Sequence, residues 1–473
     1  MRAKKLSILL VVAIGCGGSA AYSGGGSDLT QAAESSGGET RAAGMGSGDG
    51  AAGPRGYGRT VGAEAGGYAE SEEAVPRQPA VTVSGADGAA AVTTTTTSTV
   101  TVETVTEISV APEPVPFQQQ RALLTAASVG DHDRRDNYLD FLSRQSHFGR
   151  ELGIDPSRRV RFRVVDGRGV PVNDAQVDIS IGQGVVAGRT HADGIFDFHP
   201  GVLVPGLHGP ASARITAGQA TRTIAFQVPA HGDGGEVLLR LEGTHTAMPA
   251  ALDLAFAIDV TGSMEDELRY VNAEVTDIVT RIRQASPETR VRVAATFYRD
   301  RTDREVVQQI AFTEDVRAFA GAMAGVRASG GGDYPEDMNA GLSASLGRLH
   351  WSTGNAARVL VLIADAPPKL YHDAGYDWRN AMAEASARGI RILPVAASGA
   401  DRKVEYLFRA MGSVTGAPYV YLTDDSGVGN AHQEADTDRV AVEYFADLLT
   451  RLVVSDLRGE GMHEPGVFGP YRQ

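Results

Sequence analysis

The stretch Leu252-Asp-Leu-Ala-Phe-Ala-Ile-Asp-Val-Thr-Gly-Ser-Met264 decides the fold of the C-terminal half of this chain. It opens with an apolar run that has the composition of a buried strand. Asp259, Thr261 and Ser263 follow that run directly. From Glu265 to Ile282 the apolar residues then recur along one stripe, which predicts a helix. The stretch therefore predicts a strand, a tight polar turn and a helix, in that order.

The same alternation of strand and helix continues toward the C-terminus. Further apolar runs predict strands at Arg290–Phe297, Ala357–Ile363, Ile390–Ala396 and Ala417–Leu422. Helical spacing predicts further helices at Val316–Val326, Pro335–Leu349, Trp378–Arg388, Val404–Met411 and Thr437–Val453. Pro335 suits the first turn of its helix. Strands that alternate with helices predict a parallel sheet covered on both faces, a doubly wound, Rossmann-like α/β domain over residues 250–455.

Polar residues gather where the predicted strands end. Open sheets of this kind bind ligands beyond the C-terminal ends of their strands. Asp259, Thr261 and Ser263 occupy alternate positions of a tight turn, so their oxygens can face one point. Asp365 follows a later strand, and Asp333 lies in a glycine-rich loop just before a helix. Carboxylates and hydroxyls together suit Mg²⁺ or Mn²⁺ rather than zinc, so this pattern indicates a divalent cation site.

These features together resemble the metal-ion-dependent adhesion site of von Willebrand factor A domains, and the resemblance extends over nearly all of the chain from residue 250 onward. It implies that Asp259 reaches the metal mainly through water, that Thr261 and Ser263 bind it directly, and that Asp365 contacts it through water. It also implies a protein ligand, whose own carboxylate often completes the metal shell. The implied cofactor is Mg²⁺, with Mn²⁺ or Ca²⁺ as alternatives.

The second loop departs from that family, which commonly has Thr there, whereas this chain has Gly332-Asp-Tyr-Pro-Glu336. We predict Asp333 as the ligand from this loop. Glu336 is the alternative, because the length of the loop allows two alignments. A carboxylate in place of a hydroxyl adds negative charge at the ion, which tightens metal binding and weakens the ion's attraction for an acidic partner.

The first sixteen residues predict a signal for export. Basic residues precede a short apolar run, which ends at Cys16, the only cysteine of the chain. Ala13-Ile-Gly-Cys16 resembles a bacterial lipoprotein processing site, which implies that Cys16 carries lipid. The alternative is a plain signal peptide in which Cys16 is incidental. The lipid-anchored form places the protein on the bacterial cell envelope, at the outer membrane, in the periplasm or on the cell surface, with the membrane contacted through the N-terminal lipid.

The chain between this signal and the α/β domain divides into three predicted parts. Residues 17–120 are rich in Gly, Ala, Ser and Thr, which predicts a disordered tether because they bury too little apolar surface to offset the entropy of ordering. A short helical linker is predicted over 121–156, around Asn137–Leu142. Alternating apolar and polar residues with turn dipeptides predict an all-β sandwich over 157–245. A C-terminal tail, 456–473, follows the α/β domain.

Short runs in the predicted sandwich also resemble a known kind of module. Val160–Val165 and Ala175–Ile181 alternate in the manner of half-buried strands, and Asp193-Gly194 suits a chain reversal. The runs that resemble carboxypeptidase-regulatory-like or transthyretin-like β-sandwich modules are Val165–Val172, Ala175–Val177 and Thr190–Phe198. That resemblance implies a spacer or docking module with no chemistry of its own.

Charge and motif spacing exclude several functions. A net charge of -14 disfavours nucleic-acid binding, which needs Lys and Arg to displace counterions from phosphate. A haloacid-dehalogenase-like phosphatase is a remote alternative, because Thr261 stands where that chemistry needs an acid/base carboxylate after the nucleophile Asp259. Ser263 does not lie in a Gly-x-Ser-x-Gly elbow. We therefore expect no enzyme, but a metal-dependent adhesion or assembly protein; the alternative is a scaffold or chaperone-like subunit of an envelope complex.

Overall fold

The computed structural model describes residues 106–107, 124–244, 248–371, 375–426 and 432–466. All of them belong to one compact unit of the chain, Thr97–Gln473. The predicted signal with Cys16 and nearly all of the predicted tether lie outside the described residues. Among the helices that are described, none combines the length and the apolar character needed to cross a membrane.

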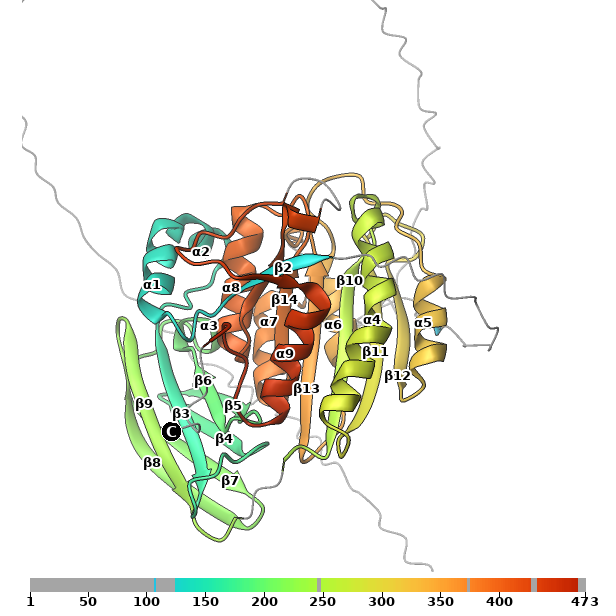
Figure 1. Cartoon of the computed structure of the whole chain (residues 1–473). Coiled ribbons are helices and arrows are strands. Elements are labelled where there is room, and N and C mark those ends of the chain that lie inside the picture. The colour runs from blue at the N-terminus through green and yellow to red at the C-terminus, as the bar shows by residue number, and fades with distance from the viewer. Residues whose placement is uncertain (1–105, 108–123, 245–247, 372–374, 427–431, 467–473) are drawn as a thin grey trace, which may run out of the picture. The chain divides into compact units, whose positions relative to one another are not determined.

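A nine-stranded sheet forms the centre of the α/β domain (Figure 1). Its strands run in the order β1-β12-β11-β10-β13-β14-β15-β2-β16. Their bounds are β1 Thr106–Glu107, β2 Thr125–Val129, β10 Ala251–Asp259, β11 Arg290–Tyr298, β12 Val307–Thr313, β13 Ala356–Ala364, β14 Arg391–Ala396, β15 Tyr419–Leu422 and β16 Val442–Tyr444. The middle strands, from β11 to β15, pair in parallel.

The prediction of a wholly parallel sheet is wrong at both edges. Strand β12 follows β11 through a short connection and pairs with it antiparallel, as a hairpin does. At the other edge β2 pairs antiparallel with both β15 and β16. Strand β2 comes from the segment predicted as a helical linker, and its sequence, Thr-Ala-Ala-Ser-Val, carries little of the branched apolar content that indicates strands.

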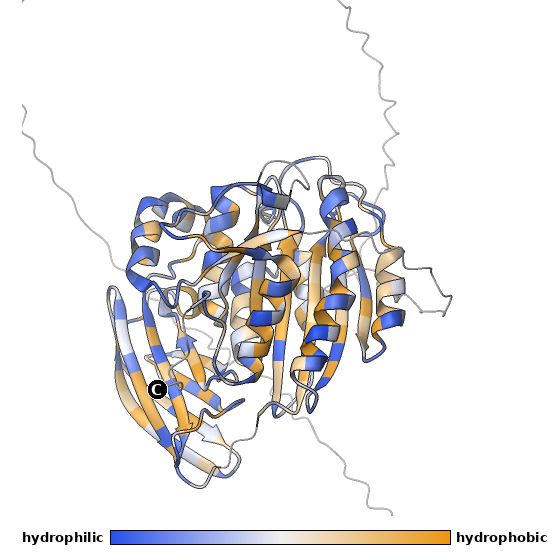
Figure 2. Ribbon diagram, in the orientation of Figure 1, coloured by the Kyte–Doolittle hydropathy of each residue, from blue (hydrophilic) through white to orange (hydrophobic). Residues whose placement is uncertain are grey.

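Helices cover both faces of the sheet. Their bounds are α4 Glu265–Ala285, α5 Val316–Ala324, α6 Met338–Gly347, α7 Trp378–Arg388, α8 Arg402–Thr415 and α9 Phe445–Leu457. Alternate side chains of β10 serve the two layers: Leu254 and Phe256 pack with α4, α5 and α9, whereas Ala255 and Ala257 pack with α6, α7 and α8. Figure 2 shows the resulting apolar strands between helices whose outer faces are hydrophilic.

Two predicted helix starts need correction. Helix α6 begins at Met338, not at Pro335, because the carboxylate of Asp337 caps it by accepting the backbone N–H of Ala340. Helix α9 begins at Phe445, not at Thr437, because Val442–Tyr444 pairs with β2 as strand β16. In both places the apolar spacing extends to residues that precede the helix. The backbone of those residues forms hydrogen bonds with other segments of the chain.

The described part of the segment before the α/β domain contains three helices and two small sheets. Helices α1 and α2 occupy Arg135–Arg144 and Ser146–Leu152, and the short helix α3 occupies Pro200–Leu203. One sheet has the order β6-β3-β9 and the other β5-β4-β7-β8, and their buried residues form one apolar cluster. Their strands are β3 Arg159–Asp166, β4 Gln176–Ile181, β5 Gly184–Arg189, β6 Ile195–Phe198, β7 Gly209–Ala217, β8 Ala220–Val228 and β9 Asp233–Leu241.

Candidate metal site

The first loop of the candidate site connects β10 to α4. Asp259, the last residue of β10, is fully buried, and its Oδ1 accepts hydrogen bonds from the backbone N–H of Thr261 at 2.9 Å and from the Thr261 hydroxyl at 2.7 Å. The hydroxyl oxygens of Thr261 and Ser263 lie 3.3 Å apart. The other carboxylate oxygen of Asp259, Oδ2, is buried and accepts no hydrogen bond from the described residues. The turn therefore gathers three predicted ligands and leaves one carboxylate oxygen free.

The third loop places a second carboxylate beside the first. Strands β10 and β13 are parallel neighbours that pair Ile258 with Ile363, so Asp259 and Asp365 leave the sheet at the same edge. Asp365 is 5% exposed, and its Oδ1 is a buried oxygen that receives no hydrogen bond within the described part of the chain. Burial and the charge of Asp365 raise the pKa of Asp259 to about 7. Burial likewise raises the pKa of Asp365, against a hydrogen bond from Ser263.

The second loop brings Glu336, and not Asp333, to these residues. The side chain of Asp333 is 56% exposed, and its carboxylate pairs with the Lys369 ammonium at 2.9 Å. Glu336 is 5% exposed, and its Oε2 is a buried oxygen without a hydrogen-bond partner among the described residues. Burial and the charge of Asp259 raise the pKa of Glu336 to about 8. The sequence prediction preferred Asp333; the arrangement in space favours the alternative, Glu336.

A glycine lets the second loop approach the first closely. Gly331 has a φ of 74°, in the left-handed region that glycine enters without steric cost. A Cβ at this position would lie 2.7 Å from Glu336 Oε1 and 3.2 Å from Thr261 Cβ. The absence of a side chain at Gly331 thus leaves room for the Glu336 carboxylate near Thr261.

The chemistry of this donor set fits a hard divalent cation. Three buried carboxylate oxygens, on Asp259, Asp365 and Glu336, have no hydrogen-bond partner among the described residues, and an unsatisfied buried polar group is costly. Oxygen donors of this kind are those that Mg²⁺ and Ca²⁺ prefer. No three His, Cys, Asp or Glu side chains in the described ranges are arranged as a metal-binding group, so a cation here would also depend on the hydroxyls of Thr261 and Ser263.

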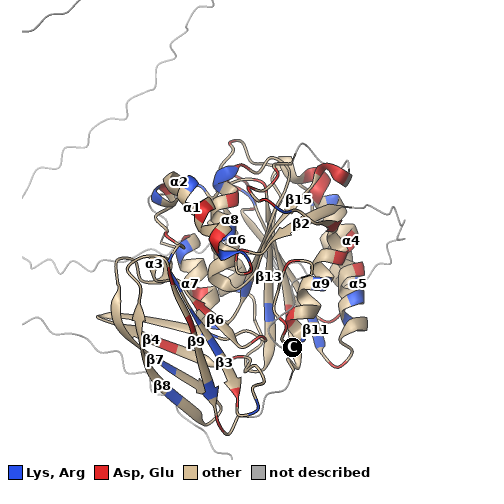
Figure 3. Ribbon diagram, turned by 60° about the vertical axis from the view of Figure 1, so that its left-hand side comes forward, with Lys and Arg blue, Asp and Glu red and all other residues tan. Residues whose placement is uncertain are grey.

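The structure adds a carboxylate that the sequence analysis missed. Glu267 lies in the acidic first turn of α4 (Figure 3) and is 1% exposed. Its Oε1 accepts a hydrogen bond from the Ser398 hydroxyl, whereas its Oε2 is buried without such a bond from any described residue. The charge of Glu267 contributes to the raised pKa of Asp365. The sequence feature that could have indicated the burial of Glu267 is its position directly before Leu268, the first apolar residue on the buried side of α4.

The charged loop after β11 borders the site. Asp300 is 1% exposed, and its carboxylate binds the Lys369 ammonium at 2.8 Å and accepts a hydrogen bond from the Tyr371 hydroxyl. Asp303 accepts the backbone N–H of Gly331 at 3.1 Å. This loop therefore holds both the glycine-rich loop and the cation of Lys369.

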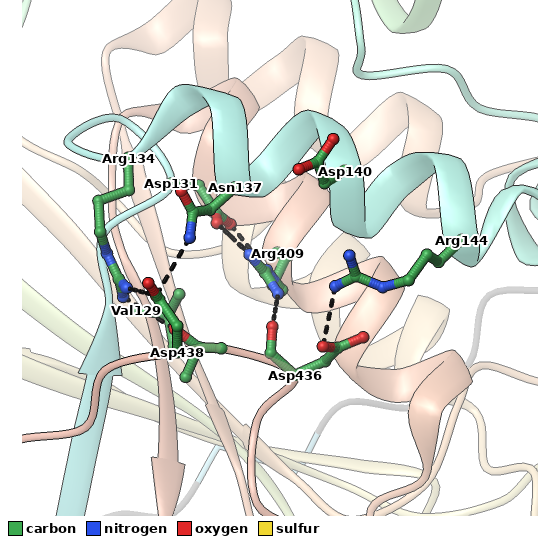
Figure 4. Close-up of a pocket in the computed structure, with 10 residues that line it drawn as sticks. Val129, Asp131, Arg134, Asn137, Asp140, Arg144, Arg409, Asp436 and Asp438 are labelled. Carbon is green, nitrogen blue, oxygen red and sulfur yellow. Dashed lines mark hydrogen bonds and ion pairs between the residues drawn. The ribbon is translucent and has the colours of Figure 1, made fainter.

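A separate cavity of about 360 Å³ lies between α1 and the segment around Asp436–Asp438 (Figure 4). Its arginines are already engaged: Arg134 pairs with Asp438, and Arg144 pairs with Asp436. Arg409 binds both oxygens of Asp131. The pairs of Arg134 and Arg144 hold α1 to the chain before α9, and each of the three guanidinium groups already has a carboxylate partner.

A family model gives the class of the domain. Residues 253–402 match the family model described as von Willebrand factor A domain. This part of the chain is thus a von Willebrand factor A domain, here with a mixed sheet.

Relatives are similar to this chain over part of their length. An ariadne-like RING finger protein of Acanthamoeba polyphaga mimivirus is 26% identical over 189 residues, which are 37% of this chain and 18% of that protein. Proximal thread matrix protein 1 from the mussel byssus has a TM-score of 0.31 and 14% identity over 46% of this chain and 48% of its own. The pilus adhesin SpaC of Lactobacillus rhamnosus GG has a TM-score of 0.30 and 14% identity, over 53% of this chain and 32% of its own.

Proposed function

We propose that the von Willebrand factor A domain binds a divalent cation, Mg²⁺ or in its place Mn²⁺ or Ca²⁺, and through it a protein partner in adhesion or assembly. The observation that carries this proposal is that Asp259, Glu336 and Asp365 each have a buried carboxylate oxygen without a partner among the described residues, in loops that meet at one edge of the sheet. The hydroxyls of Thr261 and Ser263 lie in the first of these loops. The residues that would hold the cation are Asp259, Thr261, Ser263, Glu336 and Asp365. Asp333 is not included in this set, because its carboxylate forms an ion pair with Lys369.

Protein binding is the activity that this kind of domain supports best. Members of the von Willebrand factor A family often mediate protein interactions or adhesion, and residues 253–402 match that family. A bound cation would supply a Lewis-acidic point at which a partner's oxygen completes the shell. The proposal assigns no catalytic step, because no acid/base carboxylate stands at position 261.

Calorimetric titration of the chain with Mg²⁺, Mn²⁺ and Ca²⁺ tests the cation. We expect saturable binding of at least one ion, and its loss in Asp259→Ala, because the buried carboxylate is removed from the centre of the donor set. Thr280→Ala, on the exposed side of α4, is the control and should bind as the wild type does. Absence of heat with all three ions would reject the proposal. If a captured partner stays bound in EDTA, the scaffold alternative is favoured instead.

We further propose that the protein is displayed on the bacterial cell envelope by lipid on Cys16. The support is the basic and apolar N-terminal run that ends in Ala13-Ile-Gly-Cys16. Metabolic labelling with a palmitate analogue in a bacterial host tests this. The wild-type chain should take up label and Cys16→Ser should not. An unlabelled wild type would reject lipidation at Cys16 and favour the alternative, a plain signal peptide.

A further inference from the structure

Resting on the proposed cation site, we infer that this site selects against acidic partners, and that the partner group completing the metal shell is a neutral oxygen, such as a carbonyl or hydroxyl. The sequence resemblance implied a carboxylate in this role. The negative charges buried around the site favour a neutral group instead.

Four carboxylates are buried at the site. Asp259 is fully buried, Glu267 is 1% exposed, and Glu336 and Asp365 are each 5% exposed. Each has one oxygen that accepts no hydrogen bond from the described residues. Within the described ranges none of the four forms an ion pair with Lys, Arg or His, unlike Asp253 on the same strand as Asp259. A bound divalent cation would therefore be the positive charge that these four carboxylates meet.

Glu267 belongs to this group through the loop after β14. Its Oε1 accepts the hydroxyl of Ser398, and the next residue, Gly399, has a φ of 93°. A Cβ on Gly399 would lie 3.9 Å from the Asp365 side chain, so the segment that binds Glu267 passes close to Asp365. Glu267 therefore fixes Ser398 in this segment, and its negative charge acts on Asp365.

The nearby cations do not balance these charges. Arg299 is buried, and its guanidinium donates to the backbone carbonyls of Ser329, Glu305 and Arg327. It contributes one positive charge at some distance and lowers the pKa of Asp259 only as a minor cause. The ammonium of Lys369 is shared by two other carboxylates, on Asp300 and Asp333.

A surplus of negative charge follows. A bound cation favours the ionised form of these carboxyl groups. In that state one divalent cation and Arg299 supply three positive charges against the four negative charges of the buried carboxylates. In a site of low dielectric, a further carboxylate from a partner would meet repulsion that its bond to the cation must overcome. A neutral carbonyl or hydroxyl adds no charge, so it can complete the shell without that repulsion.

Acetate binding to the Mn²⁺-loaded full chain tests this inference. The readout is the enhancement of water proton relaxation by bound Mn²⁺, which falls when acetate displaces a metal-bound water. Wild-type protein should keep its enhancement in acetate. The isosteric Glu267→Gln, which removes one charge and keeps an oxygen for Ser398, should bind acetate at least about tenfold more tightly. The matched control is Glu274→Gln, a buried glutamate further along α4 that accepts the backbone N–H of Leu124.

Each outcome separates this inference from the proposed function. If the wild type binds no Mn²⁺, the cation site itself fails. Acetate binding to the wild type as tight as to Glu267→Gln would overturn the selection against acidic groups. Exclusion of acetate from both the wild type and Glu267→Gln would also overturn it, because steric closure rather than charge would then be the cause. Tighter acetate binding in Glu267→Gln alone, with Glu274→Gln unchanged, supports it.

Discussion

At the scale of single residues, strand β10 carries two fully buried aspartates with opposite surroundings. Asp253, near its start, receives two hydrogen bonds from the Arg292 guanidinium, at 2.8 and 2.7 Å. Asp259, at its end, has only the backbone and hydroxyl of Thr261 as donors, and one oxygen remains unpartnered. A buried carboxylate is stabilised by a nearby positive charge. The cation proposed at Asp259 would therefore stabilise that carboxylate as the Arg292 guanidinium stabilises Asp253.

The two candidate ligands of the second loop can be told apart by neutral variants. Glu336→Gln should weaken Mg²⁺ or Mn²⁺ binding by at least about tenfold, because it removes a buried carboxylate from the ion. Asp333→Asn should change the affinity by no more than about twofold, because its exposed carboxylate pairs with Lys369. Isothermal titration of both variants measures this. The reverse order of effects would return the ligand role to Asp333.

At the scale of elements, the site depends on loops that follow neighbouring parallel strands. Because β10 and β13 pair in parallel, their end loops meet at one edge of the sheet, as in other open α/β sheets. The glycine-rich loop before α6 reaches this edge through backbone hydrogen bonds: Gly262 donates to the carbonyl of Gly330 at 3.2 Å, and Glu336 donates to that of Pro367 at 3.1 Å. The second loop is thus tied to both of the others.

A methyl group at Gly331 should disturb this arrangement. Gly331→Ala forces a side chain into a left-handed φ and against Glu336 and Thr261, so it should cost about 1–2 kcal/mol of stability and weaken cation binding. Gly332→Ala is the matched control, since a Cβ there meets no atom within 4 Å. Chemical denaturation and metal titration of both variants measure the two effects. Equal behaviour of the two variants would show that the close approach at Gly331 has no role.

At the scale of the whole molecule, a buried arginine joins the two-sheet region to the α/β domain. Arg391, the first residue of β14, is 2% exposed and binds Asp193 at 2.8 Å and Asp456 at 2.9 Å. Asp193 precedes β6 and Asp456 lies near the end of α9, so one guanidinium connects three distant segments. The sheet that carries the candidate site is therefore anchored to the two-sheet region at the start of β14.

Removing the negative charge of Asp193, which pairs with Arg391, should destabilise the fold. Asp193→Asn keeps an oxygen for the backbone N–H of Ile195 but breaks a buried ion pair, which costs on the order of 3 kcal/mol. Asp266→Asn is the matched control, because its pair with Arg269 is exposed and contributes less than about 0.5 kcal/mol. Urea denaturation followed by circular dichroism gives both values. A loss at Asp193 as small as that at Asp266 would show that the pair is not needed to join the two regions.

Acid should weaken the same junction through His191. Burial and the charge of Arg391 lower the pKa of His191 to about 3, so the folded protein keeps this imidazole neutral. The unfolded chain binds the proton below its ordinary pKa of about 6.5, so stability is lost as the pH falls through that value, by about 2 kcal/mol at pH 5. His191→Gln should remove this part of the pH dependence between pH 7.5 and 5, whereas His208→Gln, at an exposed position, should not. Denaturation of the three proteins across that range decides it; an unchanged slope in His191→Gln would contradict the assignment.

The sequence by itself determined the elements that depend on local pattern. Trp378–Arg388 is helical at the bounds that apolar spacing predicted, with Asp377 capping its start and Gly389 ending it in a left-handed conformation. The turn that holds Asp259, Thr261 and Ser263 is also local, because all three lie within five consecutive residues. Spacing along the chain is sufficient information for features of this kind.

Only the tertiary structure decided what depends on distant neighbours. The directions of β12 and β2, the burial of Glu267, and the arrangement that favours Glu336 over Asp333 all follow from contacts between segments far apart in the sequence. Asp333 and Glu336 are equally acidic and three positions apart, so composition gives no reason to prefer one. Lys369, which neutralises Asp333, and the opening at Gly331, which admits Glu336, exist as neighbours only after the chain has folded.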